Sequence, residues 1–158
     1  MKKITNNQSG FTLLEILLVV AAISILAGIV IVALNPAKQL GDTRNAERSS
    51  DVNTIANAIH QYTIDNGGVL PASLDTDANT YQVLGTAAAG ASCSAVSVEA
   101  AAADLSDELV PVFVVGIPTD PSTGTAADTD YYVNRDANGR ITVGACEPEQ
   151  AATIVITR

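Results

Sequence analysis

The sequence predicts an α+β fold in which one long N-terminal helix packs on a small C-terminal antiparallel sheet. Residues 11–66 have helical character almost throughout. Strand-like segments bounded by turn-forming residues follow only near the end of the chain, at 131–135, 140–145 and 152–158. Asp136-Ala137-Asn138-Gly139 joins the first two of these segments and predicts a hairpin turn.

The first part of the predicted helix is apolar enough to span a membrane. Residues 11–34 contain a single ionisable side chain, Glu15. A helix of this length measures about 36 Å, which exceeds the roughly 30 Å of a bilayer's hydrocarbon core. Lys2 and Lys3 precede the run and predict a cytoplasmic N-terminus. A secretory signal peptide is the competing interpretation, but residues 35–38 offer no cleavage site of small residues.

The second part of the predicted helix is amphipathic. Asn35-Pro36 interrupts the apolar run and predicts a kink. Gly67-Gly68 predicts the end of the helix at residue 66. Between these two points an apolar stripe of helical period predicts a face that packs on the globular domain. The residues of this stripe are Val52, Ile55, Ala56, Ile59 and Tyr62.

The globular part is patterned unevenly. Residues 69–110 are rich in Ala, Ser, Thr and Gly, and we expect one short helix there and a strand around Tyr81–Leu84. Asn134-x-Asp136-x-Asn138-Gly139 partly resembles the start of a calcium loop. Ala145 stands where such a loop needs a bidentate Glu, so the interpretation as a hairpin turn is favoured.

The charge and the cysteines limit the possible functions. Seventeen acidic and eight basic residues give a net charge of −9, which argues against a nucleic-acid-binding module. With one His and no catalytic grouping, we expect no enzyme and no catalytic residue. Cys93 and Cys146 lie beyond the predicted membrane segment, where thiols oxidise, so we expect one disulfide between them. Two buried free thiols are the alternative.

The junction before the apolar run resembles the class III signal of type IV prepilins and pseudopilins. Ser9-Gly10-Phe11-Thr12-Leu13-Leu14-Glu15 matches that signal residue by residue. The resemblance implies that a prepilin peptidase cleaves between Gly10 and Phe11 and that Phe11 is then N-methylated. It also implies that Glu15 pairs with the Phe11 amine of a neighbouring subunit during assembly, because a charge in the membrane is costly alone. The resemblance continues through the second part of the helix to residue 71 and is looser over residues 111–158, which contain Pro118-x-Asp120-Pro121.

The resemblance implies a structural filament subunit. We expect a single-pass protein of the cytoplasmic membrane that an assembly platform polymerises with itself into an extracellular filament. A type IV pilin, in particular the shaft-forming major one, is favoured over a type II secretion pseudopilin or a non-polymerising membrane-anchored binding protein. No cofactor is expected, although the loop residues Asp120, Asp128 and Asp130 are calcium candidates by analogy with major pseudopilins. The predicted segments are a leader (1–10), a membrane and filament-core helix (11–36), an amphipathic helix (37–68) and a globular domain (69–158).

Overall fold

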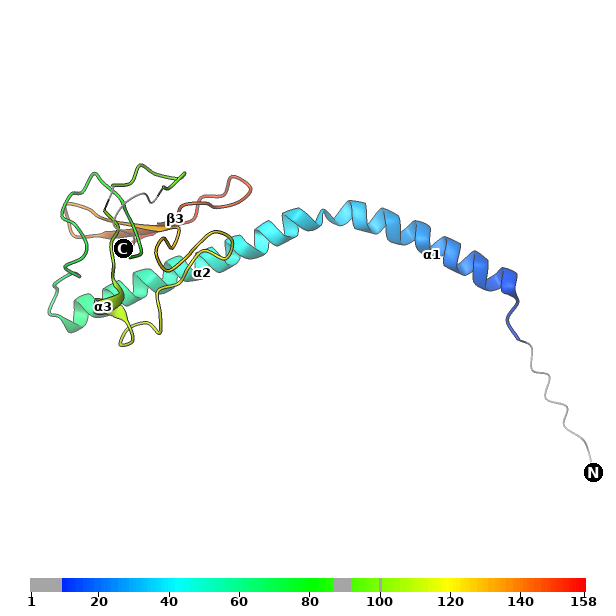
Figure 1. Cartoon of the computed structure of the whole chain (residues 1–158), viewed down its shortest axis with the longest axis horizontal. Helices are drawn as coiled ribbons and strands as arrows, with labels where there is room; N and C mark the ends of the chain where they lie inside the picture. The colour runs from blue at the N-terminus through cyan, green and yellow to red at the C-terminus, as the bar shows by residue number, and fades with distance from the viewer. Residues whose placement is uncertain (1–9, 87–91, 100) are drawn as a thin grey trace, which may run out of the picture. The chain divides into compact units, whose positions relative to one another are not determined.

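The fold is α+β, as predicted, and contains a four-stranded antiparallel sheet (Figure 1). The computed structural model describes residues 10–86, 92–99 and 101–158. Except for Gly10, the predicted leader lies outside these residues. The chain forms two compact units, residues 1–39 and 40–158. The elements are α1 (Leu13–Leu34), α2 (Pro36–Asp65), β1 (Gln82–Val83), α3 (Ser106–Leu109), β2 (Tyr131–Arg135), β3 (Ile141–Ala145) and β4 (Val155–Thr157).

The predicted interruption at Asn35-Pro36 separates two helices. Asn35 has a left-handed backbone (φ 41°) and ends α1. Its carbonyl accepts hydrogen bonds from the backbone of Lys38 and Gln39 at 3.1 and 3.3 Å, so the same residue also opens α2. Pro36 occupies the first position of α2, where the missing N–H costs nothing.

Helix α2 ends at the predicted pair of glycines. Gly67 and Gly68 both have positive φ, 67° and 93°. The Gly68 N–H donates to the Thr63 carbonyl at 2.8 Å, the bond that closes a Schellman-type C-cap. Because side chains with a Cβ rarely adopt this conformation, the two glycines determine where the helix stops.

The sheet has the order β1-β2-β3-β4, and all its neighbours are antiparallel. The predicted hairpin joins β2 to β3, with Arg135 opposite Ile141 at its closed end. In the turn, the Asp136 carboxylate accepts hydrogen bonds from the backbone N–H groups of Asn138 and Arg140, each at 2.8 Å. Strand β4 is shorter than the predicted 152–158, because its first residues belong to the loop after β3.

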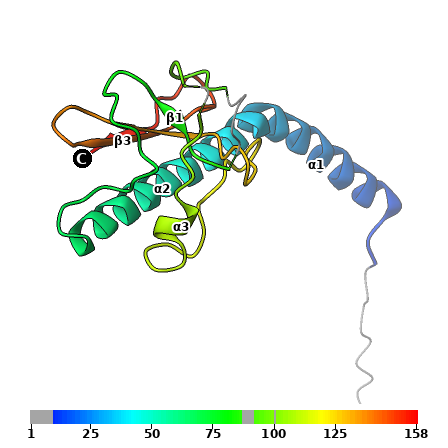
Figure 2. The ribbon, with the colours of Figure 1, turned by 60° about the vertical axis from the view of Figure 1, so that its left-hand side comes forward.

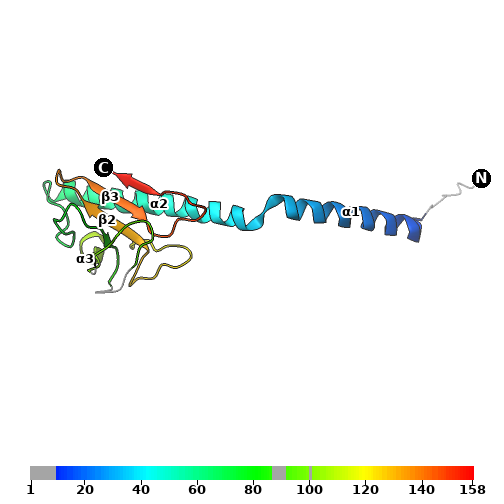
Figure 3. The same cartoon turned by 90° about the horizontal axis from the view of Figure 1, so that it is seen from above.

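Helix α2 covers one face of the sheet with the predicted apolar stripe (Figures 1 and 2). Figure 3 shows β2 and β3 running over this helix. Near the end of α2, the Tyr62 ring contacts the Phe113 ring edge to face, with centroids 5.7 Å apart, which attaches the segment after α3. The main core comprises Val52, Ile55, Ala56, Ala58, Ile59, Leu74, Leu84, Ala103, Leu105, Leu109, Tyr131, Val133, Ile141, Val143 and Ala145.

Part of the weakly patterned segment lies on the other face of the sheet. Residues 92–99 pack there against Tyr132, whose ring meets the Tyr81 ring edge to face at 5.3 Å. Gly144, opposite Tyr132, has no Cβ, and one placed there would lie 2.4 Å from that ring. Cys93 and Cys146 form a disulfide on this side (S–S 2.17 Å). The second face is therefore built from one tyrosine pair, one disulfide and the valines Val83, Val96 and Val98.

Candidate functional site

The predicted cleavage junction lies in an uncovered stretch before α1. The Phe11 side chain is 81% exposed, and Gly10 is also exposed. A Cβ at Gly10 would meet no atom within 4 Å, so the described fold does not itself require a glycine there. A requirement for glycine at position 10 would therefore reflect recognition by another molecule, such as an enzyme that cleaves at this position.

Helix α1 begins with a capping arrangement between Thr12 and Glu15. Thr12 is the N-cap, and its hydroxyl oxygen accepts a hydrogen bond from the Glu15 backbone N–H at 3.2 Å. Glu15 is the third helical residue, so Thr12-x-x-Glu15 has the sequence of a capping box. The spacing of these two residues in the sequence is the signal from which the cap could have been predicted. The structure forms only the bond from the Glu15 backbone N–H, which most residues could donate, so the cap does not by itself require Glu at position 15.

The capping arrangement does not account for the negative charge. The Glu15 side chain makes no ion pair and no hydrogen bond among the described residues. An anion in the first turn gains from the helix dipole, typically 0.3–1 kcal/mol at exposed sites, whereas a charge costs about 2.5–3.5 kcal/mol at a bilayer centre and less toward an end of the span. A carboxylate in this apolar surrounding therefore needs a cationic partner from elsewhere.

No residue of α1 is buried, although the helix is almost wholly apolar. By length and composition it can cross a membrane. Its small polar group is satisfied internally, because the Ser24 hydroxyl donates to the Val20 carbonyl at 2.8 Å. Gly28 is uncrowded, since a Cβ added there would meet no atom within 4 Å. Such a surface is stable against lipid or against other apolar helices, and the described residues offer it neither.

The calcium candidate Asp120 is bound by an arginine of α2. Asp120 is buried, and both its carboxylate oxygens accept hydrogen bonds from the fully buried Arg48, at 2.5 and 3.0 Å. The Ser122 hydroxyl and backbone N–H also donate to Asp120, at 2.7 and 2.8 Å. Burial alone would raise the pKa of Asp120, but the hydrogen bonds from Arg48 and Ser122 outweigh it and lower the pKa to about 2.

The other two calcium candidates lie on the same loop. The Asp130 backbone N–H donates to the Asp128 carboxylate at 3.1 Å. Burial raises the pKa of Asp130, and the charges of Asp128 and Asp120 raise it further. Within the described part of the chain, no three acidic, His or Cys side chains converge on one metal position. The cation that the structure places against Asp120 is the guanidinium of Arg48.

A second loop joins the same network through Glu149. Arg44 makes two hydrogen bonds to the Glu149 carboxylate, at 2.5 and 2.6 Å, and Arg48 makes a third at 3.2 Å. Asn45 exchanges two hydrogen bonds with the Glu149 backbone, at 2.9 and 3.0 Å. This network was not predicted from the sequence. Its signal was Arg48 itself, which lies four residues before Val52 and so on the apolar stripe.

Comparisons with known proteins match the N-terminal segment to a family model and less than half of the chain to two relatives. Residues 5–31 match the prokaryotic N-terminal methylation motif. The chain is 40% identical over 62 residues to the type II secretion system core protein G of Escherichia coli (strain K12), and 41% identical over 59 residues to that of Aeromonas hydrophila. These matches cover 39% and 37% of this chain, and they span only 41% and 40% of the relatives' lengths. No solved structure matches significantly.

Proposed function

Because its N-terminal segment matches the prokaryotic N-terminal methylation motif, we propose that this chain is a structural subunit of a helical filament of the pilin and pseudopilin type. In this proposal a prepilin peptidase of the membrane removes residues 1–10, and the new Phe11 amine is N-methylated. The subunit waits in the cytoplasmic membrane, with its N-terminus on the cytoplasmic side, until an assembly platform adds it to the filament. The chain is a substrate of enzymes and is not itself one.

The unburied apolar surface of α1 carries the proposal. A helix of 22 residues without one buried side chain cannot remain in water, and lipid covers it only until assembly. In a filament, the α1 helices of neighbouring copies replace the lipid. Contacts of this kind repeat without closing, which gives a polymer of indefinite length.

The charge of Glu15 supports the same proposal. Cleavage before Phe11 creates an amine four residues from Glu15, at one end of an apolar helix. Within one chain, the helix cap uses only the backbone N–H of Glu15, which donates to Thr12. The Glu15 carboxylate is therefore available to pair with another chain. Pairing it with the Phe11 amine of the next copy would neutralise two costly charges and fix the axial register.

Two filament types fit these features. The relatives named type II secretion system core protein G favour a pseudopilin of such a system. The disulfide of the globular unit and the size of that unit favour a type IV pilin, the interpretation preferred from the sequence. Deleting the gene distinguishes them: loss of surface filaments indicates a pilin, and loss of protein secretion with filaments intact indicates a pseudopilin.

Mass spectrometry of the purified protein tests the processing step. We expect a mature N-terminus at Phe11 with one added methyl group, and Met1 or an internal terminus near residue 35 would contradict the proposal. Gly10→Val should block cleavage without disturbing the fold, because nothing lies near Gly10. Gly28→Val is the matched control, since Gly28 is equally uncrowded and lies away from the junction. It should be cleaved normally.

Shearing of intact cells tests assembly. A filament subunit appears in the sheared, sedimenting fraction, whereas a membrane-anchored binding protein that never polymerises stays with the cells. For a pseudopilin, the same assay is made under overproduction. Recovery of the mature chain only as a detergent-soluble monomer, under both conditions, would contradict the proposed function.

A further inference from the structure

The second face of the sheet contains a cavity of about 220 Å³. It lies between residues 94–95, Tyr132 of β2 and the loop that leads into β4. Hydroxyl groups of three side chains line it, those of Tyr132, Ser94 and Thr153, and the other side chains are alanine, proline and isoleucine. None of the described residues that line the cavity is charged. Its surface is therefore a mixture of apolar groups and neutral hydroxyl groups.

The Tyr132 hydroxyl group is the unusual feature of this cavity. Tyr132 is only 5% exposed, yet its hydroxyl group makes no hydrogen bond with any residue that the structure describes. The neighbouring Tyr131, on the opposite face of the sheet, donates its hydroxyl to the Asp51 carboxylate at 2.7 Å. A buried tyrosine hydroxyl normally has a partner, because an unpaired polar group away from water costs free energy. Since Tyr132 lines the cavity, a ligand bound there can supply the missing partner.

Contacts outside the cavity hold two of its sides in place. On one side, the Ser94 hydroxyl donates to the Cys146 carbonyl at 2.7 Å, next to the disulfide. On the other side, the loop into β4 is tied to α2 through Glu149, which pairs with Arg44 and Arg48. A site that exists before the ligand arrives needs little ordering on binding, which favours affinity for a small ligand.

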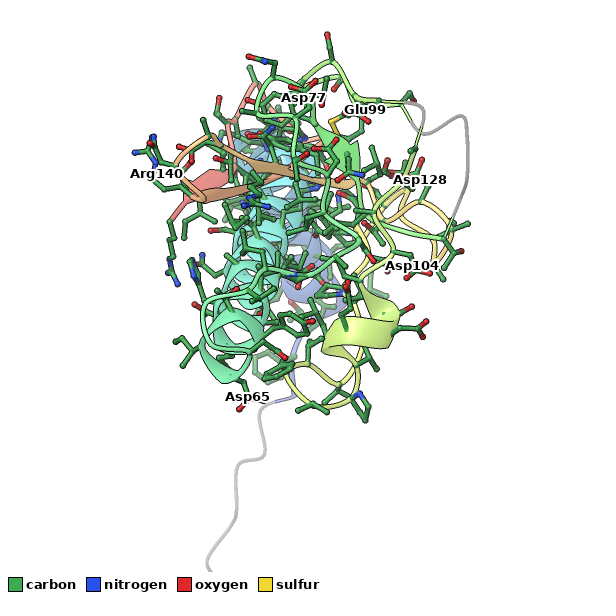
Figure 4. The ribbon with its side chains drawn as sticks, turned by 90° about the vertical axis from the view of Figure 1, so that its left-hand side faces the viewer. Asp65, Asp77, Glu99, Asp104, Asp128 and Arg140 are labelled. Atoms are coloured by element: carbon green, nitrogen blue, oxygen red, sulfur yellow. A yellow bond between two sulfur atoms is a disulfide. The ribbon has the colours of Figure 1, made fainter. Side chains whose placement is uncertain are left out.

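The charges near the cavity favour a neutral ligand. Glu147 directly precedes the lining residue Pro148. Figure 4 shows Asp77 and Glu99 on the side of the sheet away from α2, which is the side of the cavity. These carboxylates would repel an anion. A cation would lose water and meet no carboxylate among the described lining residues, so it would remain uncompensated.

We propose that this cavity binds a neutral pyranose sugar. An apolar ligand would leave the Tyr132 hydroxyl unpaired, whereas the hydroxyl groups of a sugar both donate and accept hydrogen bonds. The C–H groups of the ring would pack on the alanine and proline side chains. The volume fits one ring, because about 220 Å³ holds roughly seven waters and is smaller than the pockets of drug-sized ligands, which begin at about 300 Å³.

An amide side chain of a second copy is the competing occupant. It too donates and accepts hydrogen bonds, but one asparagine or glutamine side chain is smaller than the cavity and would leave part of the lining without contacts. The sugar is therefore the better match. The inference goes beyond the proposed function and does not depend on it, because that function rests on α1 and the junction before it.

Titration of the full chain by NMR tests the site. The chain is kept in a detergent without a sugar headgroup, and the methyl glycosides of glucose, galactose and mannose are added to tens of millimolar, because so small a ligand binds in the millimolar range. With at least one of them, the methyl signals of Ala95, Ala145 and Ala152 should shift and saturate, and that of Ala58 in the main core should not. No shift with any of the three, or shifts that never saturate (an adventitious additive only), would overturn the inference.

Tyr132→Phe tests the hydroxyl group by itself. It should weaken binding about three- to tenfold, the value of one hydrogen bond. It should leave the midpoint of urea unfolding unchanged, because the hydroxyl makes no hydrogen bond among the described residues. Tyr81→Phe is the matched control, since Tyr81 packs on the same ring and is not among the lining residues, and it should bind normally. The methyl glucuronide, which adds a carboxylate, should bind more weakly than the methyl glucoside. Equal binding by Tyr132→Phe, or tighter binding of the glucuronide, would contradict the proposal.

A free sugar and the end of a glycan chain present the same ring, and immobilisation separates these two sources. Beads that carry the bound pyranose through its anomeric oxygen should retain the chain if the site accepts the end of a glycan, and the free methyl glycoside should release it. Binding of the free glycoside alone indicates a small-molecule ligand; either result supports the site. If the wild type bound no pyranose and Tyr132→Phe lowered the yield of sheared filaments, the occupant would be a second copy and the inference would be wrong.

Discussion

Arg48 on α2 and Asp120, 72 residues later, form a two-pronged ion pair with both side chains fully buried. The pair fastens the loop before β2 to the helix that carries the core. Its geometry satisfies both carboxylate oxygens, and Ser122 supplies two further donors to Asp120. Removing one partner of such a pair is strongly destabilising, because the other charge then stays buried without a counter-charge and without solvation by water.

Removing Arg48 should therefore destabilise the globular unit severely. For Arg48→Met we expect the free energy of unfolding to fall by about 3–5 kcal/mol, since Asp120 is left buried and uncompensated. Arg44→Met is the matched control: Arg44 is 29% exposed, so its loss should lower the free energy of unfolding far less than loss of Arg48. Urea unfolding of the detergent-solubilised chain measures both. Equal losses for the two variants would show that burial of the pair does not govern stability.

The same pair should make stability depend on acid pH. The folded pKa of Asp120 is about 2, against an ordinary value of 3.8. A carboxyl with a depressed folded pKa contributes stability fully above its unfolded pKa and loses that contribution as the pH falls toward the folded pKa. We expect a contribution of about 2 kcal/mol above pH 4 to disappear between about pH 4 and pH 2.

Comparison with Asp120→Asn isolates this contribution, because the other titrating groups are common to both proteins. The difference in unfolding free energy between the two should narrow as the pH is lowered from about 5 to about 2. A difference that stays constant over this range would mean that Asp120 is not held ionised by Arg48.

The disulfide should provide a large share of the stability of the second sheet face. Cys93 and Cys146 are 53 residues apart, and closing a loop of that length contributes about 4 kcal/mol in the chain-entropy account. Cys93→Ser/Cys146→Ser should lower the midpoint of urea unfolding accordingly, whereas treating the unreduced wild type with a thiol-blocking reagent should change it little. Thiol labelling of the denatured, unreduced protein should detect no reactive thiol. Two reactive thiols per chain would contradict the predicted bridge.

The helices and the hairpin were predictable because their determinants are local. The apolar stripe from Val52 to Ile59, the glycines at 67 and 68, and the turn at 136–139 each specify structure within a few residues. The predicted strand Tyr131–Arg135 agrees with β2 to the residue. In residues 69–110 only the strand around Tyr81–Leu84 and one short helix were predicted, and β1 and α3 confirm them. The rest of this region was not predictable, because Tyr81 and Leu84 bridge to segments 17 and 19 residues away.

The sequence shows the N-terminal motif directly, whereas it does not show the ion-pair network of the globular unit. Gly10, Phe11 and Glu15 stand in a contiguous motif, whereas Arg48, Asp120 and Glu149 meet only after the chain folds. Charge patterns read along the sequence do not show which carboxylate faces which guanidinium. The loop aspartates were therefore named only as calcium candidates by analogy, and the contact of Asp120 with an arginine of α2 was not predicted.

The charge of Glu15 can be separated experimentally from its place in the helix cap. Gln also occupies the last position of a capping box, so Glu15→Gln should leave α1 helical and membrane-inserted while removing the charge. We expect normal cleavage after Gly10 but at least about tenfold fewer sheared filaments, because the Phe11 amine of the neighbouring copy loses its partner. Glu15→Asp, which keeps the charge, should assemble better than Glu15→Gln.

Thr12→Ala removes the N-cap hydroxyl instead, at a cost of about 1 kcal/mol in helix stability. If Thr12→Ala abolished filaments and Glu15→Gln assembled normally, position 15 would serve the start of the helix rather than pairing between subunits.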